Sequence, residues 1–232
     1  MIDFHSHVLP NIDDGSRSVT ESVTLLEMLS TQGVKTVCAT PHFMATEDEP
    51  EAFFEKRRRS FESLKNELAA SAPDLRLGAE VLYYSGISRL SELSRFCIEG
   101  SRLLLLEMPF HAWNEYVVKE VLELSCSGEF QLVLAHIERY LPYQSEEVFE
   151  KLLEYDVVMQ SNAAFFLKFR TKRKALRMLS EGKIHLLGSD CHNITSRQPE
   201  LAAARAVIER KLGSDFLSFY DERAERFLEG LE

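Results

Sequence analysis

Short apolar runs alternate along the chain with segments in which apolar residues recur at helical spacing. The runs that read as strands cover residues 1–7, 34–42, 75–84, 102–110, 130–136, 157–162 and 184–190. The segments with helical spacing cover residues 18–33, 50–71, 114–128, 145–156, 171–183, 198–213 and 215–232. Apolar strands that alternate with amphipathic helices predict a mostly parallel sheet covered by helices.

The number of repeated units narrows the fold class. About seven strand–helix units in 232 residues predict an α/β fold with a small, distorted (β/α)7 barrel of the TIM type. A doubly wound open sheet is the alternative that the same alternation allows. No linker, repeat or low-complexity stretch interrupts the pattern, so we expect residues 1–232 to form a single domain. Ser18 with Glu21 gives a capping-box pattern, and Gly33 follows as a natural helix end.

Composition and charge exclude several classes of protein. Hydrophobic residues make up 45% of the chain, enough for a sizeable core, but no apolar run approaches the ~20 residues that span a bilayer. We therefore expect no membrane insertion, and the first residues do not predict a signal peptide. The formal net charge of −10 argues against nucleic acid as a partner. None of the four cysteines forms C-x-x-C, so we expect them to be reduced, as in the cytoplasm.

Polar side chains that could bind metal gather where the predicted strands end, which is the active-site edge of parallel α/β folds. These candidates are His5, His7, Asp14, His42, Glu80, Glu107, His136, Asp190 and His192. Taken singly, a histidine at such a place is more often a hydrogen-bonded structural residue or a general base, and a carboxylate often caps a helix. Taken together, several desolvated imidazoles and carboxylates at one edge need a cation to neutralise them.

Spacing along the chain supports some of these candidates and removes others. In the His-x-His of residues 5–7, both rings leave the same face of an extended strand. D-D-G is also a turn sequence, and in that alternative Asp13 and Asp14 both only shape a loop. We favour Asp14 as a ligand and Asp13 as a turn former or a support for a ligand. His111, in a predicted loop, and His185, within a predicted strand, are left out of the site.

The number of candidate ligands indicates the chemistry. Four carboxylates and five neutral histidines are too many for one divalent ion and would fill two or three. Three divalent ions against four carboxylates leave a formal charge of about +2, which attracts phosphate. Such a site also lowers the pKa of bound water. The sequence therefore predicts phosphomonoester hydrolysis by attack of a metal-bound hydroxide on phosphorus, with manganese, iron or zinc all acceptable to these ligands.

Several motifs resemble a known family. The segments HSH, TPH, GAE, AHIERY and SDCHN resemble the motifs of the polymerase and histidinol phosphatase (PHP) superfamily. The opening MIDFHSHVLPNIDDG, with LLLLEMP and QSNAAF, is most similar to its bacterial branch of manganese-dependent protein-tyrosine phosphatases for capsule and exopolysaccharide synthesis. The resemblance extends from residue 1 to about 200. It implies a PHP fold, Mn²⁺ as cofactor, a cytoplasmic enzyme, and as its partner the phosphorylated tail of a tyrosine kinase.

The resemblance also implies a role for each candidate. The first ion would be held by His5, His7, Glu80 and Asp190. Glu80 would bridge to a second ion that is also held by Glu107 and His136. The third ion would be held by Asp14, His42 and His192. The catalytic residues that grip the phosphate would be Arg139 and Arg197.

Without the resemblance, simpler roles would explain both arginines: an ion pair of Arg139 with Glu138, and a cap or ion pair near the last barrel helix for Arg197. The chain also departs from the usual family pattern at two positions. Ile137 stands where proline is usual, and Phe43 stands where a second histidine is common. Neither position is a candidate ligand, so we expect them to affect substrate preference more than metal binding.

Three alternative functions stay open. Cys191 and Arg197 have the C-x5-R spacing of cysteine-dependent tyrosine phosphatases, but the loop lacks glycines and strand alternation points Cys191 away from the ligands. A PHP-type phosphatase of a small phosphomonoester, such as histidinol phosphate, would use the same metals. A non-catalytic regulator that binds phosphotyrosine is disfavoured by the intact ligand set. The basic run at residues 55–59 is interpreted as a solvated helix face rather than a binding site for a kinase tail.

Overall fold

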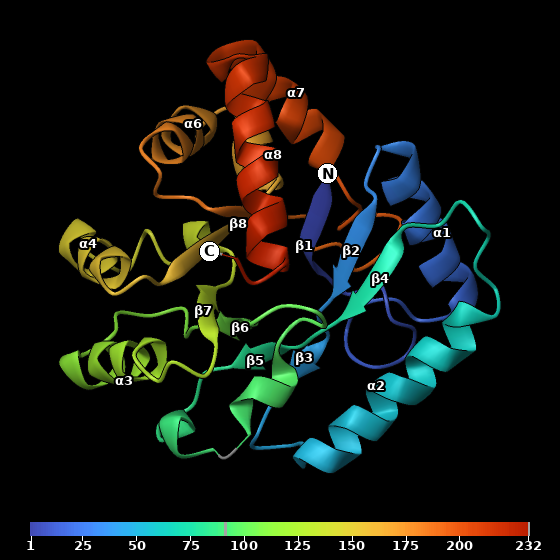
Figure 1. Cartoon of the computed structure of the whole chain (residues 1–232), viewed down its shortest axis with the longest axis horizontal. Helices are drawn as coiled ribbons and strands as arrows, with labels where there is room; N and C mark the ends of the chain where they lie inside the picture. The colour runs from blue at the N-terminus through green and yellow to red at the C-terminus, as the bar shows by residue number, and fades with distance from the viewer. Residues whose placement is uncertain (91, 232) are drawn as a thin grey trace.

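The computed structural model describes residues 1–90 and 92–231, and its helices wrap around a curled sheet (Figure 1). The strands are β1 Ile2–Ser6, β2 Thr36–Ala39, β3 His42–Phe43, β4 Asp74–Leu77, β5 Glu80–Leu82, β6 Leu103–Glu107, β7 Gln131–Leu134, β8 Val158–Asn162 and β9 Leu186–Gly188. The α-helices are α1 Val19–Thr31, α2 Pro50–Lys65, α3 Glu115–Ser125, α4 Glu146–Glu154, α5 Ala164–Leu167, α6 Lys172–Ser180, α7 Leu201–Leu212 and α8 Ser214–Leu228. Short 3-10 turns are η1 Ile87–Arg89, η2 Leu93–Phe96 and η3 Ile137–Arg139.

All strand pairs in the described residues are parallel, and together the strands form a curled sheet. One set of strands pairs in the order β1-β2-β4 and the other in the order β3-β5-β6-β7-β8-β9. The last strand returns to the first, because the backbone N–H of Asp190 donates to the carbonyl of His5 at 2.8 Å and that of His7 to the carbonyl of Cys191 at 3.0 Å. The predicted α/β fold with a distorted parallel barrel is confirmed. The alternative prediction of a doubly wound open sheet is wrong, since these bonds join the β1 edge to the β9 edge.

Two of the predicted strands are each broken in the middle. The run at residues 34–42 divides into β2 and β3, and the run at residues 75–84 divides into β4 and β5. Pro41, which has no N–H to donate to a ladder, marks the first break. At the second break, a Cβ on Gly78 would come within 2.9 Å of the Ile98 side chain, so the chain needs glycine there. If β2 with β3 and β4 with β5 are each counted as one broken strand, the expected seven strand positions remain.

The breaks change where two candidate ligands lie. His42 and Glu80 were expected at or near the ends of their strands, but they stand at the beginning of β3 and of β5. They are direct partners in the parallel register of these two strands. The backbone N–H of Glu80 also donates to the carbonyl of Pro41 at 3.0 Å, which ties the two breaks together. Both side chains therefore project from the second half of a broken strand into the mouth of the barrel.

The predicted helices are found, with different ends. Ser18 caps α1 by accepting from the backbone N–H of Glu21 at 3.1 Å, as its pattern predicts. The carboxylate of Glu21 bonds the N–H of Arg17, not that of Ser18, so the capping box is only half formed. Helix α2 ends at Lys65 and not near residue 71, and the short α5 was not predicted. Short elements such as α5 carry too few residues for periodicity to reveal them.

The strands give the site a rigid frame. Every residue of β6 and of β8 is buried, and the hydrophobic core continues around the barrel. Truncation of one such leucine typically costs 2–5 kcal/mol, so positions fixed by this core are held firmly. Within the described ranges, no helix combines the length and apolar character needed to cross a membrane.

Candidate metal centre

The nine side chains predicted to be metal ligands lie together at the mouth of the barrel. Three groups among them have ligand atoms within 4.8 Å of one another: His7 with Asp14, His42 and His192; His5 with His7 and Asp190; and His42 with Glu80 and Glu107. His136 adjoins the third group, since its Nε2 lies 2.9 Å from Oε1 of Glu80 and 3.2 Å from Oε1 of Glu107. Residues from seven separate parts of the chain therefore meet in one place.

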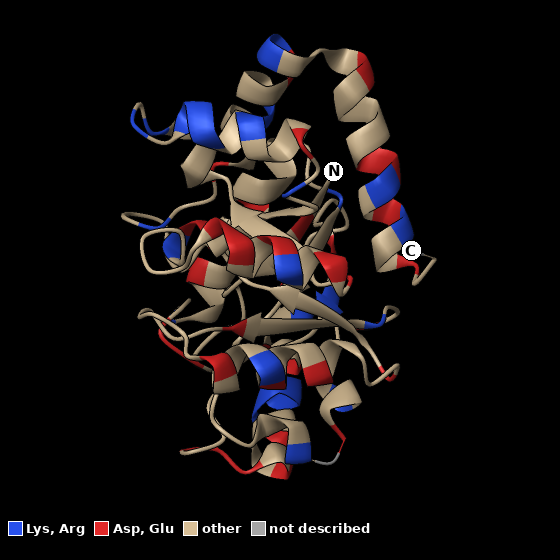
Figure 2. Ribbon diagram, turned by 90° about the vertical axis from the view of Figure 1, so that its left-hand side faces the viewer, with Lys and Arg blue, Asp and Glu red and all other residues tan. Residues whose placement is uncertain are grey.

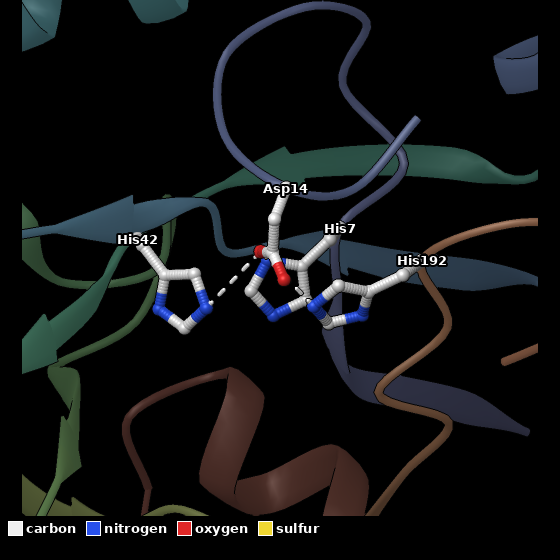
Figure 3. Close-up of side chains that lie close together, drawn as sticks. All are labelled: His7, Asp14, His42 and His192. Carbon is white, nitrogen blue, oxygen red and sulfur yellow. Dashed lines mark ion pairs between the residues drawn. The ribbon is translucent and has the colours of Figure 1, made fainter. Parts of the chain in front are cut away.

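These groups overlap more than the family resemblance implies. His7 is within reach of two groups, although the resemblance gives it to the first ion alone. His42 lies 3.5 Å from Oδ1 of Asp14 through Nε2 and 3.1 Å from Oε2 of Glu80 through Nδ1. Figure 3 shows the carboxylate of Asp14 between the rings of His42 and His192, beside His7. The assignment of each residue to a particular ion therefore stays a prediction.

The rings of His5, on β1, and of His7, which follows β1, are held in position from the side away from the cluster. Their Nε2 atoms lie 3.1 Å apart, and both approach Oε2 of Glu80, at 3.1 Å for His5 and 3.3 Å for His7. The opposite nitrogens are held by other groups: Nδ1 of His5 by Gln160 at 3.2 Å and Nδ1 of His7 by Asp13 at 2.7 Å. A partner that accepts from Nδ1–H leaves the Nε2 lone pair free for a cation.

Asp13 has both of the roles that the sequence left open. Its Oδ1 accepts from the N–H of Gly15 at 2.9 Å, which shapes the turn. Its Oδ2 accepts from the N–H of His42 at 3.0 Å and faces His7, so it also supports two candidate ligands. Gly15 is required here, because a Cβ would come within 2.4 Å of the carbonyl oxygen of His7.

Two supporting residues on β8 were not predicted. Oε1 of Gln160 accepts from the N–H of His136 at 2.7 Å besides facing His5. Nδ2 of Asn162 donates to Oδ2 of Asp190 at 2.8 Å. Both are polar residues at alternate positions near the end of a buried strand. The same strand alternation that predicted His5 and His7 could have identified Gln160 and Asn162.

Two candidate ligands adopt an uncommon backbone conformation. His136 has φ of 31° and Asp190 has φ of 52°, in the left-handed region that few residues other than glycine adopt. Each lies just beyond a strand, β7 or β9, and turns its side chain back toward the cluster. Such backbone strain typically costs about 1–3 kcal/mol and is concentrated at functional sites.

In the absence of metal, protons neutralise part of the cluster. Burial by itself lowers the pKa of His7 and His136, but neighbouring carboxylates outweigh it. Asp13 and Glu80 hold the pKa of His7 well above its ordinary value, and Glu107 and Glu80 raise that of His136 to about 9. Burial would raise the pKa of Glu80, yet the surrounding histidines keep it well below its usual range. Glu80 thus keeps its negative charge and needs positive partners.

Asp190 joins the cluster to two arginines. Its Oδ2 accepts from Nη2 of Arg139, and its Oδ1 accepts from Nη2 of Arg197 at 2.8 Å. Burial acts to raise the pKa of Asp190, but His5, His7 and Arg139 together lower it below its ordinary value. Arg139 does not pair with Glu138, which accepts from Ser161 and Asn162 instead.

The arginines stand at the edge of an open cleft. About a third of each side chain is exposed, 36% for Arg139 and 37% for Arg197. Nη1 of Arg197 also lies 3.8 Å from Oδ2 of Asp14, whose side chain is 65% exposed. The cleft measures about 530 Å³ and is also lined by Asp13, His42, Met44, Lys56, Glu80, Glu107 and Asp190. A small anion could therefore reach both the guanidinium groups and the cluster.

The residues fit a bound cation by an independent criterion. Nδ1 of His42 and Nε2 of His192 are buried without a hydrogen-bond partner in the part of the chain that the structure describes. They lie 3.1 Å from Glu80 and 3.3 Å from Asp14, respectively, without the geometry of a hydrogen bond. Burial and nearby His7 lower the pKa of His192 to about 4, so its ring is neutral and able to act as a ligand. Buried polar atoms rarely stay unpaired, and a metal ion would satisfy them.

Cys191 is poorly placed to act as a nucleophile. Its side chain is fully buried, and burial raises the pKa of its thiol. Arg197, which the C-x5-R spacing would place over the same phosphate, pairs with Asp190 and Asp14. A reactive thiolate needs a lowered pKa and access to substrate, and Cys191 has neither.

Sequence comparisons relate the chain to a family of capsule proteins. A family model described as capsular polysaccharide synthesis, CpsB/CapC, matches residues 1–224. The tyrosine-protein phosphatase YwqE of Bacillus subtilis is 28% identical over an alignment of 238 residues, which covers 98% of this chain and 91% of that protein. The tyrosine-protein phosphatase CpsB of Streptococcus agalactiae serotype V is 31% identical over 232 residues, covering 93% and 92%.

Structural comparisons agree. A crystal structure from a study of YwqE from Bacillus subtilis and CpsB from Streptococcus pneumoniae, described as unique metal-dependent tyrosine phosphatases, matches with a TM-score of 0.84 at 26% identity. The match covers 99% of this chain and 95% of that chain. Histidinol phosphate phosphatase of Lactococcus lactis, solved with zinc, L-histidinol and phosphate, matches with a TM-score of 0.58 at 11% identity, covering 90% and 92%. At that identity the second match shows a shared fold only.

Proposed function

Because this chain belongs to the CpsB/CapC family of capsular polysaccharide synthesis, we propose that it is a metal-dependent protein-tyrosine phosphatase. The family membership confirms the prediction made from its motifs. Relatives with this activity in their names align over nearly the whole chain. The observation that carries the proposal is the gathering of nine candidate ligands and two arginines around one cleft.

We propose that the cluster holds two or three divalent cations, with Mn²⁺ as the first choice and iron or zinc as alternatives. The ligands would be His5, His7, Asp14, His42, Glu80, Glu107, His136, Asp190 and His192. Bound cations would offset the charge of the phosphate and lower the pKa of water. Asp13 and Gln160 would fix the ring orientations of His7 and His5, as hydrogen-bond partners of metal ligands usually do.

The two arginines would act directly on the phosphoryl group. A guanidinium offers a planar pair of N–H donors that matches two phosphate oxygens. Arg139 and Arg197 both reach Asp190 from the cleft, so they are close enough to bind one small anion. We propose that they orient the phosphate and stabilise the charge on its equatorial oxygens in the transition state. A phenolate leaves with less acid assistance than an alkoxide.

An exposed aromatic ring supports an aryl substrate. Phe110 is 46% exposed, and its ring centroid lies 5.9 Å from that of His136 and 5.8 Å from that of Tyr140. The guanidinium carbon of Arg139 lies 5.8 Å from the Phe110 ring. We propose that this ring packs against the phenyl group of phosphotyrosine while the phosphate reaches the arginines.

The proposed physiological substrate is the phosphorylated tail of a tyrosine kinase that controls capsule or exopolysaccharide synthesis. The family description and the names of the CpsB relatives support a role in capsule synthesis. We further propose that the enzyme works in the cytoplasm, where such a tail would be available. The open cleft would admit a flexible peptide.

Chelation and metal replacement test the proposed function. The purified protein should lose phosphotyrosine-peptide hydrolysis when treated with a chelator and regain it when Mn²⁺ is added back. Cys191→Ser should stay active, and loss of activity in that variant with no effect of chelation would contradict the proposal. Higher kcat/KM for histidinol phosphate or another alkyl phosphate than for phosphotyrosine peptides would favour a small-molecule phosphatase. Peptide binding without turnover at excess Mn²⁺ would favour a regulator.

A further inference from the structure

A strongly basic segment that the proposed chemistry does not use lies beside the candidate metal centre. Residues 168–177 read KFRTKRKALR, six Lys and Arg with no Asp or Glu, in a chain whose formal net charge is −10. The segment includes the loop after α5 and the first part of α6. Figure 2 shows it as the blue loop and helix in the upper left of the view. We call residues 168–177 the basic face.

The charges of the basic face are largely unneutralised. Lys168, Arg170 and Arg173 are exposed, and their side chains make no ion pair or hydrogen bond within residues 1–90 and 92–231. Arg177 lies 3.9 Å from Glu181, and the charges of Arg177 and Lys174 also act on Glu146. These cations are therefore available to an outside partner.

The other basic run of the chain is different. In residues 55–59 on α2, Arg58 lies 2.8 Å from Glu55 and 2.6 Å from Glu62, and Arg59 lies 2.6 Å from Glu55. Arg58 and Arg59 therefore form a solvated helix face with internal ion pairs, as the sequence indicates, whereas Lys56 and Arg57 donate to the carbonyls of Ile12 and Gly78. The two runs are both rich in basic residues, but the basic face differs in that its exposed cations have few ion-pair partners.

The basic face also conflicts with the local needs of its helix. Lys172, Arg173 and Lys174 occupy the first turn of α6, and no acidic residue lies there. Thr171 makes no side-chain capping bond. The positive end of the helix dipole favours acidic residues, so cations at this place weaken the helix. A sequence that breaks a local rule without an evident structural gain often does so at a functional site.

A cleft connects the basic face to the phosphate-binding arginines. It measures about 510 Å³, and Lys168 and Thr171 line it together with Arg139 and Arg197. Beyond Lys168, a second hollow is lined by basic residues of the range 170–177. A chain that leaves the two arginines through this cleft would meet Lys168 first and the rest of the basic face next.

From this placement we infer that the basic face binds an acidic stretch of the substrate polypeptide that flanks the phosphotyrosine. The inference rests on the proposed function, since it assumes a phosphotyrosine held by Arg139 and Arg197. Charge complementarity supports an acidic partner, and opposite charges of this kind raise association rates by about 10–10³-fold at low salt. A membrane surface could touch the fully exposed Phe169, but it could not enter the cleft that Lys168 lines.

Two matched triple variants test this inference in the Mn²⁺-loaded enzyme. The first is Lys168→Gln/Arg170→Gln/Arg173→Gln, and the control, with the same change in charge on α2, is Arg58→Gln/Arg59→Gln/Lys65→Gln. The substrates are a phosphotyrosine peptide flanked by glutamates, its counterpart with glutamines, and p-nitrophenyl phosphate. Binding of the unphosphorylated glutamate peptide is measured by fluorescence anisotropy with and without metal.

We expect the wild-type enzyme to prefer the glutamate peptide over the glutamine peptide by about tenfold in kcat/KM, with the preference falling as salt rises. The basic-face variant should lose this preference, keep its activity on p-nitrophenyl phosphate, and melt no lower than the wild type. The control should behave like the wild type. A wild-type enzyme without the preference, or a basic-face variant that keeps it, overturns the inference.

Two further outcomes separate this inference from neighbouring ones. Binding to phosphatidylglycerol vesicles that the basic-face variant loses, with peptide kinetics unchanged, overturns the inference in favour of a membrane surface. A failure to hydrolyse p-nitrophenyl phosphate with any metal contradicts the proposed function. Anisotropy still tests the inference in that case. Weaker binding of the glutamate peptide by the basic-face variant alone supports the inference, and equal binding by all three proteins overturns it.

Discussion

The floor and the edge of the candidate metal centre are built differently. The floor consists of His5, His7, Glu80, His136 and Asp190, all of which are buried. The edge consists of Asp14, Arg139 and Arg197, whose side chains are 65%, 36% and 37% exposed. Each floor residue has partners from other strands, whereas Asp14 and Arg197 extend from loops. The contrast indicates a floor fixed by the fold to hold cations and an edge left free to meet substrate.

Removing one charge from the floor is expected to have the largest effect. Glu80→Gln leaves the size of the side chain unchanged but removes the carboxylate that faces four histidines. Turnover of p-nitrophenyl phosphate should fall by about 10³-fold or more, and the metal content measured by mass spectrometry should fall with it. Full metal content with unchanged turnover would show that the floor is not a metal site.

A change at the edge should separate catalysis from metal binding. Arg197→Gln removes a guanidinium from the cleft without touching the floor histidines. We expect kcat/KM for a phosphotyrosine peptide to fall by about 10²–10³-fold, the usual effect of losing one charge-stabilising donor. Metal content should equal that of the wild type. If the variant loses its metal instead, the division into floor and edge is wrong.

The supports behind the floor should have an intermediate effect. Gln160→Ala removes the acceptor shared by the His5 ring and the backbone of His136. Loss of such a partner typically weakens metal binding by about 10–100-fold, so the Mn²⁺ concentration that restores half of the activity should rise by that factor. Activity at saturating Mn²⁺ should be nearly normal. An unchanged Mn²⁺ requirement would mean that Gln160 does not position the ligands.

The pH should change the stability of the floor when no metal is bound. Without metal, the pKa of His136 is raised to about 9 in the folded protein, compared with 6.5 in the unfolded chain. Protonation of His136 therefore contributes its full stabilisation of the folded state below pH 6.5. That stability is lost as the pH rises from 6.5 through about 9, which denaturant titration of the metal-free protein would detect. The same proton must leave when metal binds, so calorimetry at pH 7 in buffers of different ionisation enthalpy should report proton release. His192, with its pKa lowered to about 4, has no proton to release, and an absence of proton release would argue against the floor as the site.

Removal of the exposed Phe110 ring beside Arg139 should have the smallest effect. Phe110→Ala removes the ring near Arg139 but no charge. An aromatic contact is worth about 0.5–1.5 kcal/mol, so KM for aryl phosphates should rise by about 2–10-fold. KM for alkyl phosphates should stay the same. Equal changes for both substrate types would show that the ring does not contact the phenyl group.

The sequence predicts the floor better than it predicts the geometry that holds it. The shared direction of His5 and His7 could be predicted from strand alternation, because both rings leave one face of an extended chain. The positions of His42 and Glu80 within broken strands could not be predicted. The breaks depend on contacts between distant segments, namely the bond from Glu80 to Pro41 and the close approach of Gly78 to Ile98. Asp190 and His136 reach the cluster through a left-handed backbone that no sequence pattern indicates.

The edge was harder to predict from the residues themselves. Only the family resemblance pointed to Arg139, because Glu138 next to it offers a simpler ion pair. The structure gives Glu138 other partners on β8 and turns Arg139 to Asp190, and both depend on contacts between distant segments. The basic face was missed for a related reason. Its sequence reads as an ordinary amphipathic helix, and only the structure brings Lys168 into a cleft with Arg139 and Arg197.

Anomalous diffraction at the manganese absorption edge tests the central proposal most directly. A crystal grown with excess Mn²⁺ should show two or three anomalous peaks among His5, His7, Asp14, His42, Glu80, Glu107, His136, Asp190 and His192. Peaks confined to other surfaces of the molecule, or no peak within this cluster at saturating Mn²⁺, would contradict the account.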